Sequence, residues 1–291
     1  MESYKERYER YRKRAEAELQ AQCARWDREP KILFDSMRYA LLGGGKRLRP
    51  VLFLSVLDRI GGHSEEEGAL AAAIEMIHTY SLVHDDLPAM DNDDFRRGKP
   101  SVHKQFGEAN AILCGDALLN EAAILAVEAA ARPEGHAAAA RELMVAAGAT
   151  GMIAGQTYDL YYEKSEAAGE AELNKIYEGK TGKLITAPLV MAACIAGKRK
   201  TELKAFGREL GLLFQLTDDI LDVVGDEKSL GKSVGKDEAE GKLTAVKVYG
   251  LQGAKERANA VAAHCLSLLR AVPEEDGFLT GLVQNVLSRT N

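Results

Sequence analysis

The stretch GLLFQLTDDILDVVGD, residues 211–226, has the spacing of a helix with one polar face. Four polar side chains recur at positions i, i+3, i+4 and i+7, which lie on one side of an α-helix: Gln215, Asp218, Asp219 and Asp222. The remaining positions are almost all apolar, so we expect this helix to be buried. Because buried carboxylates without a positive partner are too costly to retain, the stripe predicts a bound cation.

A second acidic cluster ends the upstream stretch IEMIHTYSLVHDDLPAMD, residues 74–91. Pro88 cannot donate the hydrogen bond that a helix interior needs, so we expect the helix to end or kink there. Its last turn then holds Asp85 and Asp86, and the following loop brings Asp91 back toward them. Carboxylates at this end of a helix meet the negative end of its dipole, which a cation would offset. Oxygen ligands of this kind suit Mg²⁺, which commonly joins carboxylates to substrate phosphates.

The rest of the chain predicts an all-α fold, because apolar residues recur at helical spacing and strand-like alternation is absent. Helices are expected over residues 66–86, 109–131, 137–160, 203–224 and 253–271, after an opening helix with Tyr4, Tyr8, Tyr11, Ala15 and Leu19 on one face. Breaks are expected at residues 43–45, 61–62, 92–100, 132–133 and 225–241. A single acidic cluster is often only a solvated helix face. Two such clusters, each in an apolar helix, instead indicate two halves of one site. We therefore predict a single all-α domain over residues 1–291.

Four glycine-flanked basic segments accompany the acidic clusters: GGGKRLRP (43–50), FRRGKP (95–100), GKTGK (179–183) and GKSVGKDEAEGKLT (231–244). Glycine-rich turns followed by Lys and Arg suit phosphate oxygens, and arginine adds bidentate geometry. A P-loop is excluded by its spacing, and an EF-hand by Phe95 and Arg96, which occupy loop positions five and six. His78 shares a helix face with Asp85 and is a candidate binding residue, whereas His84 is interpreted as structural. We find no pattern of a nucleophilic triad.

Composition limits the function further. The chain has 291 residues and a formal net charge of −6, which argues against a protein that coats nucleic acid. The longest uncharged apolar stretch, Leu184–Gly197, is shorter than the roughly 20 residues that a membrane span needs. The N-terminus lacks the apolar core of a secretory signal, and the cysteines are scattered singly. We therefore expect a cytoplasmic protein without a membrane partner.

Taken together, these motifs resemble the short-chain trans-prenyltransferases of the polyprenyl synthetase family, and most closely their bacterial farnesyl diphosphate synthases. The segments quoted above occur in the family's order, and the resemblance covers residues 32 to 250. It implies an isoprenoid-synthase helical bundle around a central cavity, usually a homodimer. It also implies Mg²⁺, with three ions in each active site, and isopentenyl diphosphate and allylic diphosphates as substrates.

The resemblance also assigns roles to individual residues. Metal ions on the allylic diphosphate would be held by Asp85, Asp91 and Asp218, supported by Asp86 and Asp222, with Asp219 completing the second motif. That diphosphate would be bound by Arg96, Lys180, Lys232 and Lys242. Isopentenyl diphosphate would be bound by Lys46, Arg49, His78 and Arg97. Thr181 and Gln215 would face the developing carbocation. Lys232 and Lys242 lie in the segment that aligns least securely.

The expected product has fifteen carbons, because Tyr80 lies five residues before Asp85 and, with Ser81, at the level that forms the tunnel floor in similar enzymes. The alternative is a geranylgeranyl diphosphate synthase with a twenty-carbon product. A terpene cyclase of the same fold is disfavoured, since such enzymes typically keep only one DDxxD motif. A regulatory prenyltransferase subunit is also disfavoured, because such subunits tend to lose the aspartates.

Overall fold

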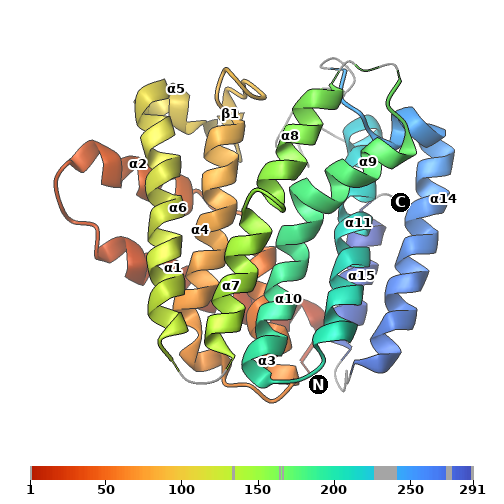
Figure 1. Ribbon diagram of the computed structural model, residues 1–291, viewed down its shortest axis with the longest axis horizontal. Helices are drawn as coiled ribbons and strands as arrows, with labels where there is room; N and C mark the ends of the chain where they lie inside the picture. The colour runs from red at the N-terminus through yellow and green to blue at the C-terminus, as the bar shows by residue number, and fades with distance from the viewer. Residues whose placement is uncertain are drawn as a thin grey trace.

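Long α-helices form the framework of the computed structural model (Figure 1), which describes residues 2–132, 135–163, 165, 167–225, 241–272 and 277–289. The all-α prediction is confirmed for these residues. The long helices in chain order are α1 (Tyr4–Ala24), α2 (Lys31–Leu41), α3 (Leu48–Arg59), α4 (Gly68–Asp85), α6 (Glu108–Ala130), α7 (His136–Ala147), α8 (Met152–Tyr162), α10 (Lys183–Ala196), α11 (Lys200–Val224), α14 (Ala245–Leu268) and α15 (Phe278–Ser288). Shorter elements are η1 (Ser64–Glu66), α5 (Val102–Phe106), α9 (Glu170–Ile176), the π-helical turn η2 (Tyr177–Gly182) and η3 (Leu269–Ala271).

One predicted helix is wrong as a single element. Residues 137–160 form two helices, α7 and α8, with a break between them from Gly148 to Gly151. The backbone of Gly148 is extended, and a Cβ atom at Gly151 would collide with the carbonyl of Ala146. Two glycines three residues apart therefore end one helix and start the next, although the surrounding apolar pattern continues.

A short hairpin follows α4 and carries two of the predicted arginines. Its strands are β1 (Phe95–Arg96) and β2 (Lys99–Pro100), which pair antiparallel with Arg96 opposite Lys99. The two turn residues, Arg97 and Gly98, have φ of 55° and 75°, as a type I′ turn requires. The hairpin thus turns inside the break that was expected at residues 92–100.

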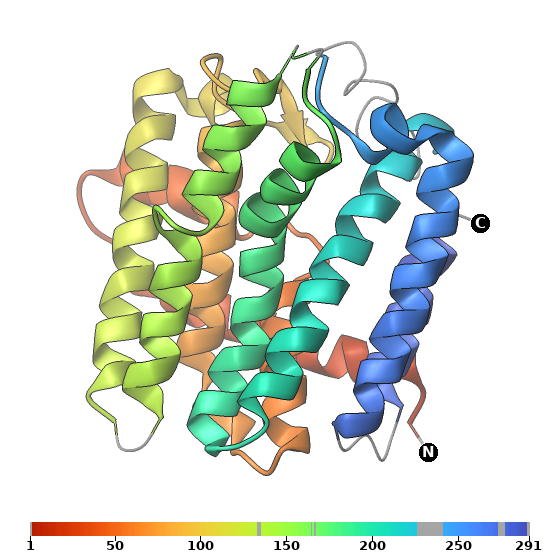
Figure 2. The ribbon, with the colours of Figure 1, turned by 45° about the vertical axis from the view of Figure 1, so that its right-hand side comes forward.

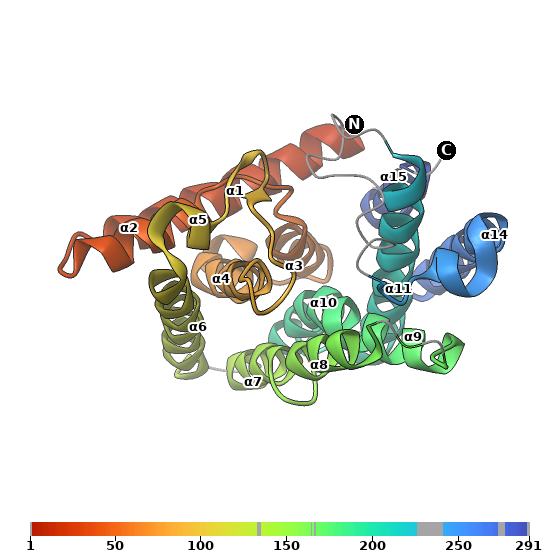
Figure 3. The ribbon, with the colours of Figure 1, turned by 90° about the horizontal axis from the view of Figure 1, so that it is seen from above.

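The motif-bearing helices α4 and α11 lie on either side of α3 and α10 (Figure 3). α10 packs against α3, α7 and α11, and all its residues from Leu184 to Ala193 are buried. α4 packs against α3 and α6, and α11 packs against α14. The hairpin after α4, the end of α8 and the start of α14 meet at one end of the bundle, at the top of Figures 1 and 2. Both acidic motifs are carried toward this end.

The start of α14 is fixed by a side-chain cap. Thr244 Oγ1 accepts a hydrogen bond from the backbone N–H of Lys247 at 3.2 Å, which satisfies one of the free donors at the helix start. The capped turn comes directly after Lys242. The position of this lysine therefore depends on a helix that packs against α11.

In the described part of the chain, α6 alone is long and apolar enough to cross a membrane by length and composition. The sequence analysis counted only uncharged stretches, and α6 contains charged residues, so it was not singled out there. Buried helices of folded domains meet the same criterion. One side of α6, which includes Leu118, Ala122 and Leu125, is buried, and α6 packs against α2, α4 and α7.

Candidate active site

The first acidic motif surrounds the C-terminal end of α4, as predicted. The helix ends at Asp85, and the chain then turns back over its own end. The backbone N–H of Asp91 donates to the carbonyl of Asp85 at 2.9 Å, and that of Asp93 donates to the carbonyl of Asp86 at 3.1 Å. The motif therefore forms a compact turn in which the three predicted aspartates are neighbours.

Asp85 is a buried carboxylate in a mixed electrostatic environment. Burial raises the pKa of Asp85 to about 6; the Lys180 ammonium opposes the rise and the Asp91 carboxylate adds to it. The Gln156 side-chain amide donates to Asp85 at 2.5 Å, and Lys180 Nζ lies 3.7 Å from it. An added cation would favour the ionised form of this buried carboxylate.

Asp86 has a different partner. Its side chain is almost fully buried and accepts hydrogen bonds from the guanidinium of Arg96, including one from Nε at 2.9 Å. Arg96 also lies 3.0 Å from Asp93. This pairing holds the hairpin arginine against the end of α4.

Lys180 lies in the π-helical turn η2, and its side chain contacts both α8 and the first motif. Its Nζ donates to Asp159 Oδ2 at 2.7 Å. Burial lowers the pKa of Lys180, but Asp85 and Asp159 more than offset this, so the net shift is upward. The ammonium is therefore held in its charged form between two carboxylates. π-helical turns of this kind are frequent at functional sites.

The second motif lies along α11, and its predicted polar stripe is confirmed. Gln215 and Asp218 are partly exposed, whereas Asp219 and Asp222 are buried. Asp218 lies 3.1 Å from the guanidinium of Arg289 at the end of α15. The flanking Val223 is exposed, so the helix is not apolar and buried all round at its C-terminal end.

Asp219 links three elements. Its Oδ2 accepts a hydrogen bond from the hydroxyl of Tyr177 in η2 and one from the backbone N–H of Ala245 at 2.6 Å. Burial and the Asp219 charge raise the pKa of Tyr177 well above its usual value, so the hydroxyl stays protonated as a donor. Asp219 thus fastens the start of α14 to α11.

The basic loop before α3 meets the hairpin at the same site. Gly45 has a φ of 121°, which favours glycine, and a Cβ atom there would lie 2.6 Å from Cζ of Arg97, so a larger residue would displace the guanidinium. Burial lowers the pKa of Lys46, with Arg289 adding to the effect and Asp218 opposing it. Burial likewise lowers the pKa of Arg49 to about 10. The loop therefore lies within electrostatic reach of the second motif.

His78 is neutral at this site. Burial lowers its pKa well below the usual value, and the surrounding arginines, with Arg49 and Arg97 foremost, lower it further. Lys242 lies 3.0 Å from Asp91, which joins the segment before α14 to the first motif. Lys232 lies outside the described residues.

A cavity of about 280 Å³ adjoins these charged groups. Charged and polar side chains that line it include Arg49, His78, Asp85, Lys180 and Thr181. Its apolar lining includes Met90, Met152, Leu160 and Leu184, and Tyr80 and Ser81 also line it. Tyr80 is buried, its ring packs edge-on against His84 at 5.9 Å, and burial raises its pKa to about 12. The cavity thus combines ionic groups with an apolar lining.

The donor set suits Mg²⁺. Carboxylates come from two helices, and hard oxygen ligands are what this ion prefers. In the described residues, no three Asp, Glu, His or Cys side chains form a ready-made metal cluster. Basic groups hold the aspartates instead, with Lys242 on Asp91, Arg96 on Asp86 and Arg289 on Asp218.

The profile of the polyprenyl synthetase family matches residues 30–275. The chain belongs to this family. It is 44% identical over 234 residues to a chloroplastic geranylgeranyl pyrophosphate synthase of Capsicum annuum, a match that covers 79% of this chain but only 63% of the plant enzyme. It is 40% identical over 260 residues to the farnesyl diphosphate synthase of Micrococcus luteus, covering 88% and 89% of the two chains.

The fold agrees with this family. A crystal structure of a geranyltransferase from Helicobacter pylori, complexed with magnesium and isoprenyl diphosphate, superposes with a TM-score of 0.85. The two chains are 33% identical, and the match covers 97% of this chain and 95% of the other. The predicted isoprenoid-synthase helical bundle is therefore confirmed.

Four residues of this polyprenyl synthetase site were missed by the sequence analysis: Gln156, Asp159, Tyr177 and Arg289. Gln156 and Asp159 stand at i and i+3 on the otherwise apolar α8, and this spacing was a usable signal. Tyr177 and Arg289 carried no such signal, because their partners on α11 lie far away in the sequence.

Proposed function

We propose that this chain catalyses the head-to-tail condensation of isopentenyl diphosphate with an allylic diphosphate in the presence of Mg²⁺. The observation that carries the proposal is a cavity lined both by apolar side chains and by the ionic or polar groups of Asp85, Lys180, Arg49 and His78. Such a site suits a substrate with a diphosphate at one end and a hydrocarbon chain at the other. Family membership and the two intact aspartate motifs support it.

The residue roles follow from these positions. We propose that Asp85, Asp91 and Asp218, with Asp86 and Asp222 nearby, hold three Mg²⁺ ions. When bound, these ions neutralise the charge that develops on the departing diphosphate. Arg96, Lys180, Lys242 and the undescribed Lys232 bind the allylic diphosphate. Lys46, Arg49, His78 and Arg97 bind isopentenyl diphosphate.

In the reaction, the allylic C–O bond breaks and its electron pair leaves with the diphosphate. Lys180 is held charged by Asp85 and Asp159 and stabilises this leaving group electrostatically. Thr181 and Gln215 face the allylic cation, which the double bond of isopentenyl diphosphate attacks. The released diphosphate accepts the proton that is then lost, and the apolar walls exclude water from the cation.

We propose a fifteen-carbon product, farnesyl diphosphate, and this rests on Tyr80. The ring is buried and lines the apolar part of the cavity beside Ser81, about 7.5 Å along α4 from Asp85. A bulky aromatic at this depth limits the length of the bound chain. The alternative is a twenty-carbon product, geranylgeranyl diphosphate, which one of the similar plant enzymes is named for.

The test is a product-length assay with Mg²⁺, isopentenyl diphosphate and geranyl diphosphate. We expect the fifteen-carbon product from the natural chain and longer products from Tyr80→Ala. Tyr158→Ala is the matched control, because Tyr158 is exposed on α8 and should leave chain length unchanged. A mainly twenty-carbon product from the natural chain would exclude the proposed specificity. An unchanged length in Tyr80→Ala would remove Tyr80 from the explanation.

We also propose a homodimer in the cytoplasm. α6, α7 and α8 line one side of the molecule (Figure 3), and these helices carry exposed apolar residues outside the cavity lining: Ile112, Leu113, Ile124, Val127, Val145 and Tyr161. Burial of such a surface against a second copy would remove it from water. All four cysteines are unpaired, which supports a reducing compartment.

A further inference from the structure

The basic loop before α3 contains an arginine that turns away from the cavity. Arg47 stands between Lys46 and Arg49, yet its side chain is fully buried in the interior. Its backbone is left-handed, with a φ of 53°, an uncommon conformation for a residue with a side chain. The surrounding contacts must therefore hold this residue in place.

Arg47 makes a hydrogen bond with every nitrogen of its guanidinium. Nη1 donates to Glu75 Oε1 at 2.8 Å, Nε donates to Glu16 Oε1 at 2.8 Å, and Nη2 donates to the carbonyl of Leu41 at 2.7 Å. Glu75 is as deeply buried as Arg47, with 1% of its side chain exposed. Three elements, α1, α2 and α4, are thus fastened to one side chain of the loop.

Glu75 connects this anchor to the cavity. It lies three residues before His78, so the two side chains are neighbours on α4. Its Oε2 is buried and accepts no hydrogen bond from the described residues. The charge of Glu75 also acts on the guanidinium groups of Arg49 and Arg97. One carboxylate therefore acts on three arginines, and it is hydrogen-bonded to Arg47.

We propose that Glu75 and Arg47 are positioning residues for isopentenyl diphosphate. Their buried ion pair fixes the left-handed turn of the loop, so that Lys46 and Arg49 on either side present their cations to the diphosphate. Neither residue touches the substrate. The inference rests on the proposed function, because it concerns the binding of one of its two substrates.

Two effects of Glu75 have opposite signs, and this makes the inference testable. As a nearby negative charge, Glu75 repels a diphosphate, so its neutralisation alone would tighten binding. As an anchor for Arg47, it holds the loop in its binding geometry, so its neutralisation would weaken binding. Breaking a buried charge pair is costly because the remaining charge loses its partner. We therefore expect the anchoring effect to dominate.

The experiment measures the affinity of isopentenyl diphosphate by calorimetric titration in EDTA, for the natural chain, Glu75→Gln and Arg47→Lys. We expect both variants to bind it about tenfold more weakly. In the condensation assay, the KM for isopentenyl diphosphate should rise, while the KM for geranyl diphosphate stays within about twofold. Arg47→Lys keeps the charge but cannot make three hydrogen bonds in fixed directions, so it tests the anchor if Glu75→Gln does not fold.

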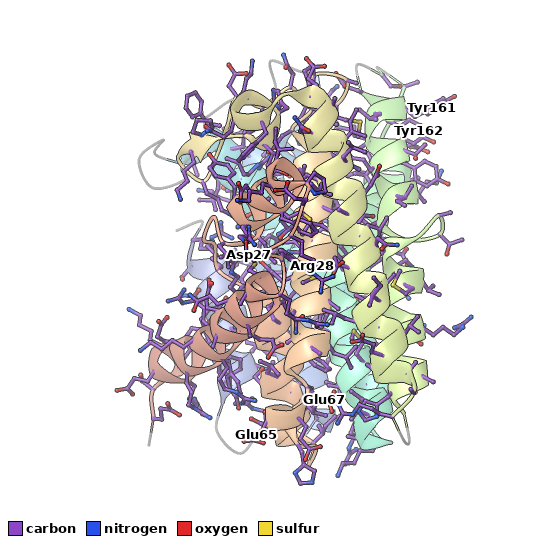
Figure 4. All side chains as sticks on the ribbon, turned by 90° about the vertical axis from the view of Figure 1, so that its left-hand side faces the viewer. Asp27, Arg28, Glu65, Glu67, Tyr161 and Tyr162 are labelled. Atoms are coloured by element: carbon purple, nitrogen blue, oxygen red, sulfur yellow. The ribbon has the colours of Figure 1, made fainter. Side chains whose placement is uncertain are left out.

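Glu67→Gln is the matched control. Glu67 is also buried, and it lies 3.0 Å from both Arg132 and His136. It is at the N-terminal end of α4, opposite to Asp85, near the lower end of the molecule in Figure 4. Its neutralisation should reduce stability and leave the affinity for isopentenyl diphosphate unchanged. Equal weakening in this control would show a general effect of stability and would overturn the inference.

Unchanged or tighter binding in both Glu75→Gln and Arg47→Lys would also overturn it, and would leave the proposed function intact. Failure of the proposed function has a different signature. In that case the natural chain itself would neither bind isopentenyl diphosphate nor condense it with geranyl diphosphate, and the inference would fail with it.

Discussion

The aspartates of the two motifs have different partners, although the sequence pattern gives them equal weight. Asp86 is paired with Arg96, Asp219 is bonded to Tyr177, and Asp85 lies between Gln156 and Lys180. The sequence predicted a positive partner for the carboxylates of both motifs, from helical spacing and burial in the second motif and from the helix dipole in the first. It did not predict which groups supply them, since Tyr177 and Asp219 meet only when η2 packs on α11.

Asp85→Asn is expected to stabilise the protein in EDTA and to abolish its proposed activity. Burial raises the pKa of Asp85 to about 6, so the ionised form is disfavoured in the folded state. The contribution of Asp85 to the free energy of unfolding of the natural chain is therefore more favourable below pH 4 than above pH 6. This advantage is lost as the pH rises through 6. The neutral amide of asparagine removes the cost of burying an ionised carboxylate. The resulting gain in the free energy of unfolding should be largest above pH 6, up to about 3 kcal/mol, and should fade toward pH 4.

Urea unfolding of both chains at pH 8 and pH 4.5 measures this difference. With Mg²⁺ and substrates, Asp85→Asn should lose about a hundredfold or more in kcat, because a carboxylate ligand is missing. A variant that is less stable than the natural chain at pH 8 would contradict the electrostatic interpretation. Lower stability there would mean that the ion pair with Lys180 outweighs the cost of burial.

At the level of elements, the predicted helices agree best with the structure where the apolar periodicity extends over many residues. The helices expected near residues 66–86, 109–131 and 203–224 correspond to α4, α6 and α11. The helix over residues 137–160 was wrong because the paired glycines outweigh the continuing pattern. α10, which has Pro188 inside it, was not predicted as a helix. There the apolar packing of the whole element outweighs the hydrogen bond that the proline cannot make.

The close contact between α8 and η2 makes Gly155→Ala a sensitive change. A Cβ atom at Gly155 would collide with the backbone of Lys180, so the turn that carries this lysine must move. We expect a loss of about 1–3 kcal/mol in the free energy of unfolding, as in other overpacked contacts. The kcat should also fall, because Lys180 is displaced from Asp85.

Gly169→Ala is the control for this experiment, since a Cβ atom there meets no atom within 4 Å. Urea unfolding and the condensation assay compare the two variants. A neutral result for Gly155→Ala would mean that η2 adjusts without moving its lysine.

At the scale of the whole molecule, the formal net charge of −6 can be related to the two aspartate motifs. The six aspartates of the motifs equal the entire acidic excess, and the structure gathers them at one end of the bundle among basic groups. Which helices meet there could not be read from the sequence, because helical spacing tells which face is buried but not against what. The same limit applies to exposed apolar faces, which spacing alone cannot divide between core and interface.

The outer face of α6 supplies the test of assembly. Ile124 and Val127 are exposed on this helix, and Tyr161 is exposed at the upper end of α8 (Figure 4). A charge buried in an apolar interface is costly, so Val127→Glu should convert the proposed dimer into a monomer. Ile32→Glu on α2 is the control, because it adds the same charge at another exposed apolar position. Light scattering after size-exclusion chromatography gives the mass of each chain. A monomeric natural chain would exclude the dimer, and a Val127→Glu dimer would place the interface on another face.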